Sequence, residues 1–539
     1  MATDDETRAE ELLRRHVTYT TPRGLHVVTA RGVRSGAEQP WGTTLSGIVA
    51  PGRGAPSLAD KIVVVADETT FGLYRMSIDE VRELVAPLPY TVATIWAARM
   101  LRSLWPVRDD PEGQLQLARQ VFGAGPFIAR CQEFLSSSQV GERRYLFSEQ
   151  TLHVLERIVL ESARADEDYE WPEDAEVKMR RLGCTSVVSA ASVGAQGDAD
   201  NADKWLGFFA QNGAYNANDD PLLAYQRTWR VYVELAQSDE ARAHPQFVDF
   251  GALSRAASGA GLRELFAVGF SAMATAQMKD NVEPAEEALT EPFEQFLSTT
   301  ALAADHGTFT EALTAPRDFY AKAFVRSRAD PLRLAWETTP FQQKPFLRLP
   351  RNLLLSLSPR AVQGWLTDGV HYRLRDQAGR GEFDAFVGSL FETYIHEVFA
   401  AALPDRPSGA GRVHADEPYG KGGGELTSDV ALDYGRDLIL FEVVSTRLPL
   451  GVRAVRDDSE LASYLQRTTL DKVKQLDRVV DDLLGGKAAL DGVDMTHVER
   501  VWPVVVGIGE MVETELLWDR VRQHIGGSLS GLAQKFAHV

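Results

Sequence analysis

Cysteine is scarce in this chain, and runs long enough to cross a membrane are missing. The 539 residues include two cysteines, Cys131 and Cys184, and no Cys-x-x-Cys pair, which excludes a disulfide framework and a thiolate zinc site. The longest aliphatic runs, IVVVA and VVVGIG, have the length of strands. The amino-terminal sequence MATDDETRAEELLRRH lacks the basic start and the apolar run of a signal peptide. We therefore expect a cytoplasmic protein with no membrane association.

Positive charge is also in short supply. The 57 Lys and Arg residues are outnumbered by 76 Asp and Glu residues, which gives a net charge of −19. The molecule as a whole repels polyanions, so any nucleic-acid site must be a local basic patch. Hydrophobic residues at 44% and charged residues at 25% are typical of globular proteins and exclude wholesale disorder. At about 100 to 200 residues per domain, this length predicts two to four domains.

Local patterns divide the chain into three regions and predict an α+β multidomain protein. Residues 1–76 alternate β-type runs with turn residues, which predicts a small β-rich module. Residues 77–345 begin at Ser77, whose spacing from Glu80 is that of a capping box, and predict a mostly helical domain with a subdivision near residues 166–221. Residues 346–539 predict an α/β domain. The β-type runs of the first region are LHVVTA, TTLSGIVA, KIVVVA and FGLYRM, the last two joined by DETT, and the helical runs of the second include EALTAPRDFYAKAFVRS.

The carboxyl-terminal region predicts a particular order of elements. From residue 381 the patterns indicate a helix, a Gly-rich loop, two strands, a long helix, a strand and a final helix. A GRD turn between TSDVALDY and LILFEVVS suits an antiparallel hairpin. The run LILFEVV is almost continuously apolar, which predicts a central strand covered on both faces. Glu442 interrupts this run, and a carboxylate buried there needs a compensating cation, metal or hydrogen bond.

Asp429 offers a partner for Glu442. A hairpin that turns at residues 435–437 places the two acids on neighbouring strands, roughly 5 to 8 Å apart. Two carboxylates at that separation can share a divalent cation, and Mg²⁺ commonly takes one or two carboxylates together with water and substrate phosphate. The pair therefore predicts a Mg²⁺ or Mn²⁺ site.

These residues resemble, over about residues 381–510, the PD-(D/E)XK or restriction-endonuclease-like nuclease superfamily. That family places an acid on its first core helix, an Asp on a strand and a Glu-x-Lys on the next strand. Here GEFDAFVGSLFETYIHEVF offers Glu392, SDVALDY offers Asp429 and FEVVS offers Glu442. The helix TTLDKVKQLDRVVDDLL, with Lys474 and Gln475, is similar to the helix that follows in the family, and RVWPVVVGIG is similar to the further strand.

The resemblance implies roles for the acids and one substitution. Asp429 and Glu442 would bind the metal together with the Val443 carbonyl, and Glu392 would assist. The family's lysine would stand at Val444, where its ammonium would orient the attacking water and stabilise charge on the phosphorus centre. The candidates to replace this lysine are Lys472 and Lys474 on the following helix and Arg447 just past the strand. Gln475, beside Lys474, completes the set of candidate site residues.

Each acid also has a purely structural interpretation. Glu392 would be a surface glutamate on an amphipathic helix, and Asp429 a solvated residue near a turn. Glu442 would belong to a buried ion pair with an arginine. The sequence leaves these alternatives open.

A basic segment precedes the predicted nuclease core. Residues 317–380 contain 12 Lys and Arg against five Asp and Glu, a balance of +7, interleaved with aromatic residues. This composition predicts a track for nucleic-acid phosphates, and the alternative is that these cations pair with acids elsewhere in the protein. Residues 381–539 hold 16 basic and 26 acidic residues. That domain would therefore depend on the basic segment, on a partner protein or on a second copy to hold nucleic acid.

Together these patterns predict a metal-dependent nuclease that hydrolyses phosphodiester bonds, with DNA as the expected substrate. The resemblance further suggests an effector of bacterial defence or restriction. The competing interpretation is a catalytically degenerate nuclease fold that serves as a scaffold for nucleic acid or protein, because Val444 replaces the lysine and the domain is acidic.

Overall fold

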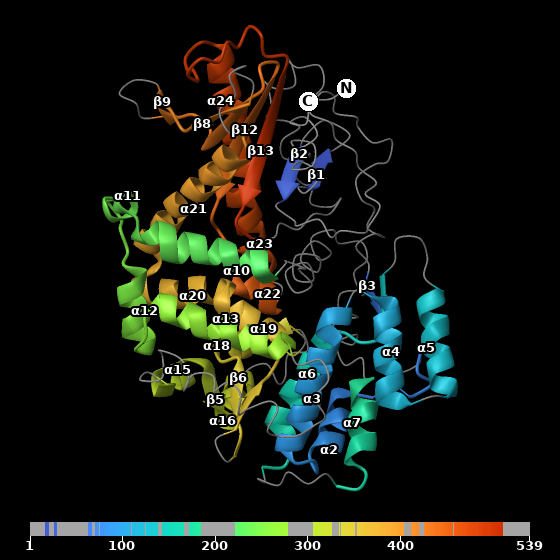
Figure 1. Ribbon diagram of the computed structural model, residues 1–539. Helices are drawn as coiled ribbons and strands as arrows, with labels where there is room; N and C mark the ends of the chain where they lie inside the picture. Colours follow the sequence, from blue (N-terminus) through green and yellow to red (C-terminus); the bar gives the residue numbers. More distant parts are fainter. Residues whose placement is uncertain are drawn as a thin grey trace. The chain divides into compact units, whose positions relative to one another are not determined.

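The structure is a computed structural model of the 539-residue chain. It describes residues 17–20, 26–29, 63–66, 70–74, 76–108, 110–123, 125–137, 143–165, 172–184, 221–278, 306–325, 334, 336–350, 353–403, 411–419, 425–455 and 457–509. Within these ranges the protein is a mixed α and β structure, as the sequence predicts (Figure 1). Every helix described there is too short or too polar to cross a membrane.

The chain forms two compact units, each assembled from segments that are distant in sequence. Unit 1 combines Met1–Leu58, Asn201–Val248 and Arg380–Val539, and unit 2 combines Ala59–Asp200 and Asp249–Gly379. The borders expected at residues 76 and 345 follow changes of pattern along the chain and stay predictions.

Unit 1 contains a mixed sheet and the helices around it. Its strands are β1 (Val17–Thr20), β2 (His26–Thr29), β8 (Arg412–Ala415), β9 (Pro418–Tyr419), β10 (Glu425–Leu426), β11 (Val430–Asp433), β12 (Asp437–Val444) and β13 (Arg500–Gly507). Its helices are α10 (Pro221–Trp229), η4 (Arg230–Glu234), η5 (Leu235–Gln237), α11 (Asp239–Arg242), α21 (Arg380–Ala402), α22 (Leu450–Val455), α23 (Asp458–Leu465), η9 (Gln466–Leu470) and α24 (Asp471–Leu484).

The main sheet of unit 1 has the strand order β13-β12-β11-β8. The hairpin of β11 and β12 is antiparallel, as the sequence predicts, and Gly435 makes its turn with a φ of 79°. β12 and β13 are parallel and are joined through α22, α23, η9 and α24. Since β12 has a neighbour on each side, the prediction that LILFEVV is a central strand is confirmed.

Helices cover both faces of this sheet. On one face, Leu440 and Ala431 belong to an apolar cluster with Val473 and Leu476 of α24. On the other face, the ring of Phe441 lies 4.6 Å from the ring of Phe399 on α21. The outer side of α21 contacts η4 and η5, and Arg230 of η4 binds a carboxylate of α21 there. The sheet is therefore the middle layer of unit 1, as burial on both faces requires.

Unit 2 is mainly helical. Its helices are α2 (Ile78–Val85), α3 (Tyr90–Leu104), η2 (Trp105–Val107), α4 (Pro111–Phe122), α5 (Pro126–Ser136), α6 (Glu149–Ser162), α7 (Ala175–Gly183), α12 (Phe250–Ser258), α13 (Leu262–Met278), α15 (His306–Leu313), α16 (Arg317–Phe324), α18 (Thr339–Gln343), α19 (Pro359–Leu366) and α20 (Asp368–Ala378). Its strands are β3 (Val63–Val65), β4 (Arg143–Tyr145), β5 (Thr314–Pro316), β6 (Phe346–Arg348) and β7 (Leu354–Ser356).

The capping box expected at the start of the helical region is present. The Ser77 hydroxyl accepts a hydrogen bond from the Glu80 N–H, and the Glu80 carboxylate accepts one from the Ser77 N–H at 2.6 Å. These bonds satisfy two backbone donors that the first turn of α2 would otherwise leave open.

Two local predictions are wrong. The run FGLYRM, predicted as a β-type run, is not a strand in its described residues: Phe71 and Gly72 form a turn, Gly72 with a φ of 72°, and β3 pairs with the distant β4. The helix predicted across residues 311–327 is divided by β5, because Pro316 has no N–H to continue the helical ladder. The β-type run TTLSGIVA lies outside the described residues.

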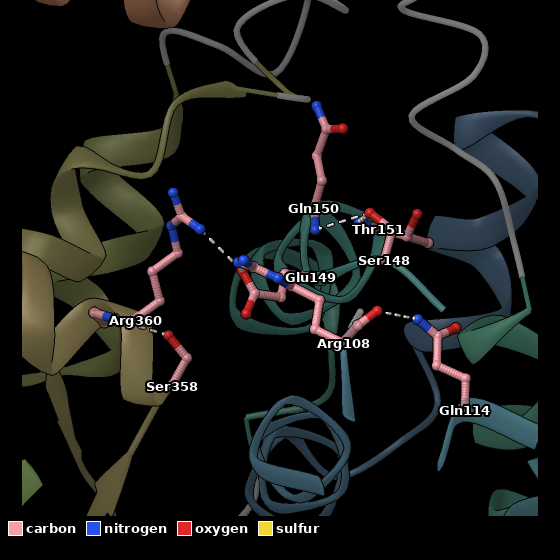
Figure 2. A network of polar contacts seen from close by, with 9 residues as sticks. Arg108, Gln114, Ser148, Glu149, Gln150, Thr151, Ser358 and Arg360 are labelled. Carbon is pink, nitrogen blue, oxygen red and sulfur yellow. Dashed lines mark hydrogen bonds and ion pairs between the residues drawn. The ribbon is translucent and has the colours of Figure 1, made fainter. Parts of the chain in front are cut away.

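Helix α6 is the buried centre of unit 2 and carries several polar side chains into it. It contacts α2, α3, α7 and α16. Figure 2 shows Glu149, its first residue, between Arg108 and Arg360. Arg360 donates to the Glu149 carboxylate at 3.1 Å, and Arg108 lies 3.7 Å from the same oxygen. Because Glu149 is almost fully buried, these arginines supply the compensation that a carboxylate in this position requires.

Glu156 is the buried acid of α6 that lacks such compensation. Its side chain is 0% exposed, and neither carboxyl oxygen has a hydrogen-bond partner among the described residues. Burial raises the pKa of Glu156 well above its usual value. The acid therefore keeps its proton in the folded protein at pH values where the unfolded chain has lost it, so the free energy of unfolding falls as the pH rises above about 4.3.

Replacing this acid with a neutral isostere tests that sign. The free energy of unfolding of wild type should fall as the pH rises from 5 to 8, whereas that of Glu156→Gln should lack this fall. The stability of the variant relative to wild type should therefore increase by at least about 1 kcal/mol over this range, since each pKa unit corresponds to about 1.4 kcal/mol. Urea unfolding at the two pH values measures the gain. The exposed Glu83 supplies the control, because Glu83→Gln should change the pH dependence of the free energy of unfolding little. An equal effect of both variants on this pH dependence would contradict the account.

Candidate active site

The register of the sheet places three acids in one row. Val430 pairs with Phe441 on β12 and with Ala415 on β8. Both ladders end at these pairs. Continuing the register by one residue would set Asp429 opposite Glu442 on one side and opposite Asp416 on the other. Directly opposite residues in a sheet point to the same face. The row therefore gathers three carboxyls at the end of β11, on the face that also carries Leu440 and Ala431.

Glu442 is the buried member of this row. Its side chain is 0% exposed, and one carboxyl oxygen, Oε2, accepts a hydrogen bond from Lys472 Nζ at 2.8 Å. The other oxygen, Oε1, is buried and has no hydrogen-bond donor in the described part of the chain. The charge of Asp429 acts on Glu442, so a proton or a cation between the two acids would satisfy this oxygen.

Lys472 thus takes the place that the sequence left to one of three cations. It is the second residue of α24, and its Nζ also lies 3.2 Å from Gln475 Oε1, which accepts a further hydrogen bond. The ammonium of Lys472 therefore donates to both Glu442 and Gln475. Lys474 is exposed and makes no contact with the acids among the described residues. It lies about 200° around the helix from Lys472, since each residue turns an α-helix by about 100°.

A wide helical turn sets this orientation. Between α23 and α24 the chain forms one π-helical turn, η9. In an uninterrupted α-helix, Lys472 would follow Leu465 on the same face, because residues seven apart point the same way. The π-turn absorbs one residue, so Val473 continues the buried face and Lys472 falls on its flank, beside Glu442. No periodicity in the sequence announces this shift.

A backbone group of β12 also binds the Asp429 carboxylate. The Val443 N–H donates to Asp429 Oδ2 at 2.6 Å. The next residue, Val444, uses its carbonyl to bind the N–H of Ile508 on the β13 side. Because backbone groups alternate in direction along a strand, the Val443 carbonyl faces the Asp429 side. This is the oxygen that the sequence proposed as a metal ligand.

Glu392 reaches the site from α21. Its side chain is exposed to solvent, yet the protein around it removes part of its water, and this desolvation followed by the charge of Asp429 raises its pKa to about 7. Lys472 acts in the opposite direction on the same group. Glu392 is therefore within electrostatic range of both the acid row and the ammonium, as a member of the site would be.

The remaining titratable groups show that the site is crowded with negative charge. Burial first, and then the charge of Asp429, raises the pKa of Glu442 to about 8. Burial also raises the pKa of Asp429, against the opposing effects of the Val443 N–H and Lys472. Burial lowers the pKa of Lys472, but the carboxylates of Glu442, Asp429 and Glu392 outweigh it and the net shift is upward. Near pH 7 Glu442, and in part Glu392, therefore retain protons that a bound cation would displace.

The donor set suits a hard divalent cation. Asp429, Glu442 and the Val443 carbonyl offer oxygen ligands, which Mg²⁺ and Mn²⁺ prefer. The buried Oε1 of Glu442, which lacks a donor, is the observation that fits an ion there. Within the described ranges no three His, Cys, Asp or Glu side chains already stand close enough to enclose a metal. Water and substrate would therefore have to complete the coordination.

Asp416 is the site residue that sequence reasoning missed. It directly follows β8, and its charge raises the pKa of both Glu392 and Asp429. The available signal was an acid immediately after a short strand, HADEP. Without knowing that β8 pairs with β11, nothing placed this acid beside Asp429.

The basic segment 317–380 lies in unit 2 up to Gly379, whereas the acids lie in unit 1. Several of its cations bind within unit 2. Arg317 donates to the Leu160 and Ala163 carbonyls, and Lys344 donates to the carbonyls of Glu311 and Ala312. Lys322 is exposed. Arg317 and Lys344 thus bind backbone carbonyls rather than the acids that the alternative interpretation names, and nucleic-acid binding would fall to other cations of the segment.

Comparison with known proteins yields no matching family model, no similar curated protein and no similar solved structure.

The ion pair of Lys472 with Glu442 predicts different stability effects for substitutions of Lys472 and of the nearby Lys474. Lys472→Met leaves the buried Glu442 carboxylate without its cation and should lower the free energy of unfolding by about 1 to 3 kcal/mol at pH 8. Lys474→Met removes an exposed lysine of the same helix and should change it by less than about 0.5 kcal/mol. Urea unfolding of both variants measures the contrast. Equal stabilities would show that Lys472 does not compensate Glu442.

Proposed function

We propose that this chain is a metal-dependent nuclease whose catalytic domain, within unit 1, is of the PD-(D/E)XK type. The observation that carries the proposal is the contact of Lys472 Nζ with Glu442 Oε2 at 2.8 Å, beside Asp429. A lysine from α24 thereby brings an ammonium to Glu442, and we propose that it substitutes for the lysine that the family would have at Val444. The order of α21, β11, β12, α24 and β13 agrees with the order expected from the sequence, and β8 is an additional strand between α21 and β11.

The residues divide the chemistry among them. Asp429, Glu442 and the Val443 carbonyl would hold Mg²⁺ or Mn²⁺, which supplies charge stabilisation at the phosphate and a more acidic bound water. Lys472 would orient the attacking water and stabilise the negative charge that develops on the phosphate oxygens. Glu392 would assist from the solvent side, and Gln475 keeps the ammonium of Lys472 in place. Hydrolysis joins the water oxygen to phosphorus and breaks the bond from phosphorus to the leaving sugar oxygen.

DNA remains the proposed substrate, with a role in bacterial defence or restriction as the context that the resemblance suggests. Residues 381–539 carry ten more acidic than basic residues, so this domain would bind a polyanion only weakly by itself. Its proposed role is therefore cleavage of the nucleic acid, and binding is left to other parts. Binding would come from exposed cations of the basic segment, such as Lys322, from a partner protein or from a second copy of the chain.

A non-catalytic scaffold is the second candidate, and Val444 together with the acidity of the domain favours it. A scaffold needs this ammonium only to compensate the buried Glu442 carboxylate. The Lys472 contact speaks for the nuclease, since it retains the one cation that the chemistry requires next to the acids.

Cleavage of nucleic acid in the presence of Mg²⁺ or Mn²⁺ separates the candidates. Wild type should cut linear, circular or single-stranded DNA, and Asp429→Asn and Glu442→Gln should remove this activity. Lys472→Met should reduce the rate by at least about 100-fold, the size of effect expected for a group that stabilises the transition state. Gel assays with RNA alongside measure the substrate class.

Lys474→Met is the matched control and should cut at the wild-type rate. Circular dichroism of each variant checks that the fold is retained. A wild-type protein that cuts none of these substrates, or a Lys472→Met variant that cuts at full rate, would contradict the proposed mechanism.

A further inference from the structure

Asp416 lies at a well-fixed point next to the acid row. It stands between β8 and the short hairpin of β9 and β10. Two hydrogen bonds close the base of this hairpin: Thr427 Oγ1 accepts from the Glu417 N–H at 2.8 Å, and the Glu417 carbonyl accepts from the Thr427 N–H at 3.0 Å. The backbone next to Asp416 is therefore held in the register that sets this acid opposite Asp429.

The charge of Asp416 acts on two elements of the site. Ala415, the residue before Asp416, pairs with Val430 of β11, the residue after Asp429, and the charge of Asp416 also acts on Glu392 of α21. In the described part of the chain no lysine or arginine pairs with Asp416, and its side chain is exposed. The ammonium of Lys472 interacts with three carboxyls of the site, those of Glu442, Asp429 and Glu392. The excess negative charge calls for a further cation.

An independent observation favours a cation in the row. Glu442 Oε1 is buried without a hydrogen-bond donor among the described residues, and the charge of Asp429 acts on Glu442. A cation between Asp429 and Glu442 would not touch Asp416 directly, because neighbouring strands are about 4.8 Å apart and Asp416 lies two strands from Glu442, roughly 10 Å across the sheet. Mg²⁺ and Mn²⁺ usually retain several water ligands, and those waters need acceptors around them.

We propose that Asp416 is a positioning residue of the cation site, which accepts hydrogen bonds from the water ligands of a divalent cation held by Asp429 and Glu442. The inference rests on the cation site of the proposed function and adds a fourth acid to it. The residue after β8, the first strand of the sheet in chain order, would then contribute to metal binding. This role would explain an acid at position 416, which pairs with no lysine or arginine among the described residues.

Manganese titration of the full-length protein tests this role. Isothermal titration calorimetry with MnCl₂ should give about tenfold weaker binding for Asp416→Asn than for wild type, which is within the usual effect of losing an outer partner of a metal site. Asp416→Glu should restore most of the affinity, because a longer carboxylate can still accept from water. Thermal unfolding without metal should be the same for wild type and Asp416→Asn, since an exposed acid contributes little to stability.

Glu417→Gln is the matched control. It removes a carboxylate one residue away, while the amide oxygen can still accept the hydrogen bond from the Asp491 N–H, and it should leave the Mn²⁺ affinity unchanged. If wild type binds Mn²⁺ and Asp429→Asn does not, but Asp416→Asn binds as tightly as wild type, the role of Asp416 is wrong and the cation site stands. If wild type binds no Mn²⁺, the cation site and the proposed function fail together with it.

Discussion

The burial of Glu442 in a central strand is the constraint on which the rest of this site depends. A carboxylate in a sheet covered on both faces is costly unless charge or hydrogen bonds compensate it. Lys472 compensates one oxygen and leaves the other without a donor among the described residues. A helix must therefore begin near the end of β12 with a lysine in its first turn, as α24 does with Lys472. The helix must also be rotated about its axis so that this lysine points toward the sheet. The π-turn η9 meets this last requirement by keeping Val473 in the core.

Much of the sheet is readable from the sequence, because its signals are local. The glycine turn after Asp433 and the apolar run around Phe441 together define a hairpin, and a hairpin fixes which residues stand opposite each other. That is why the sequence pattern alone pairs Asp429 with Glu442. The capping box at Ser77 is equally local, and it forms as expected. Such predictions need no knowledge of distant parts of the chain.

Other features depend on contacts between distant segments, and the sequence could not supply them. The choice of Lys472 over Lys474 depends on a π-turn, which has no clear pattern in the chain. The place of Asp416 depends on β8 pairing with β11 across the β9–β10 hairpin. The strand β3 pairs with β4, some 80 residues further along, rather than with its neighbour in sequence. The two compact units are also discontinuous, so that residues 201–248 join residues 380–539.

The most direct test of the central claim is the location of a cation in the site. Crystals grown with MnCl₂ and measured at the manganese absorption edge would reveal the ion by its anomalous signal. The account predicts one strong peak between Asp429 and Glu442, within coordination distance of the Val443 carbonyl, with Lys472 still bound to Glu442. A structure in which manganese is absent from this position at saturating concentration, with a proton or Lys472 alone bridging the two acids, would contradict it.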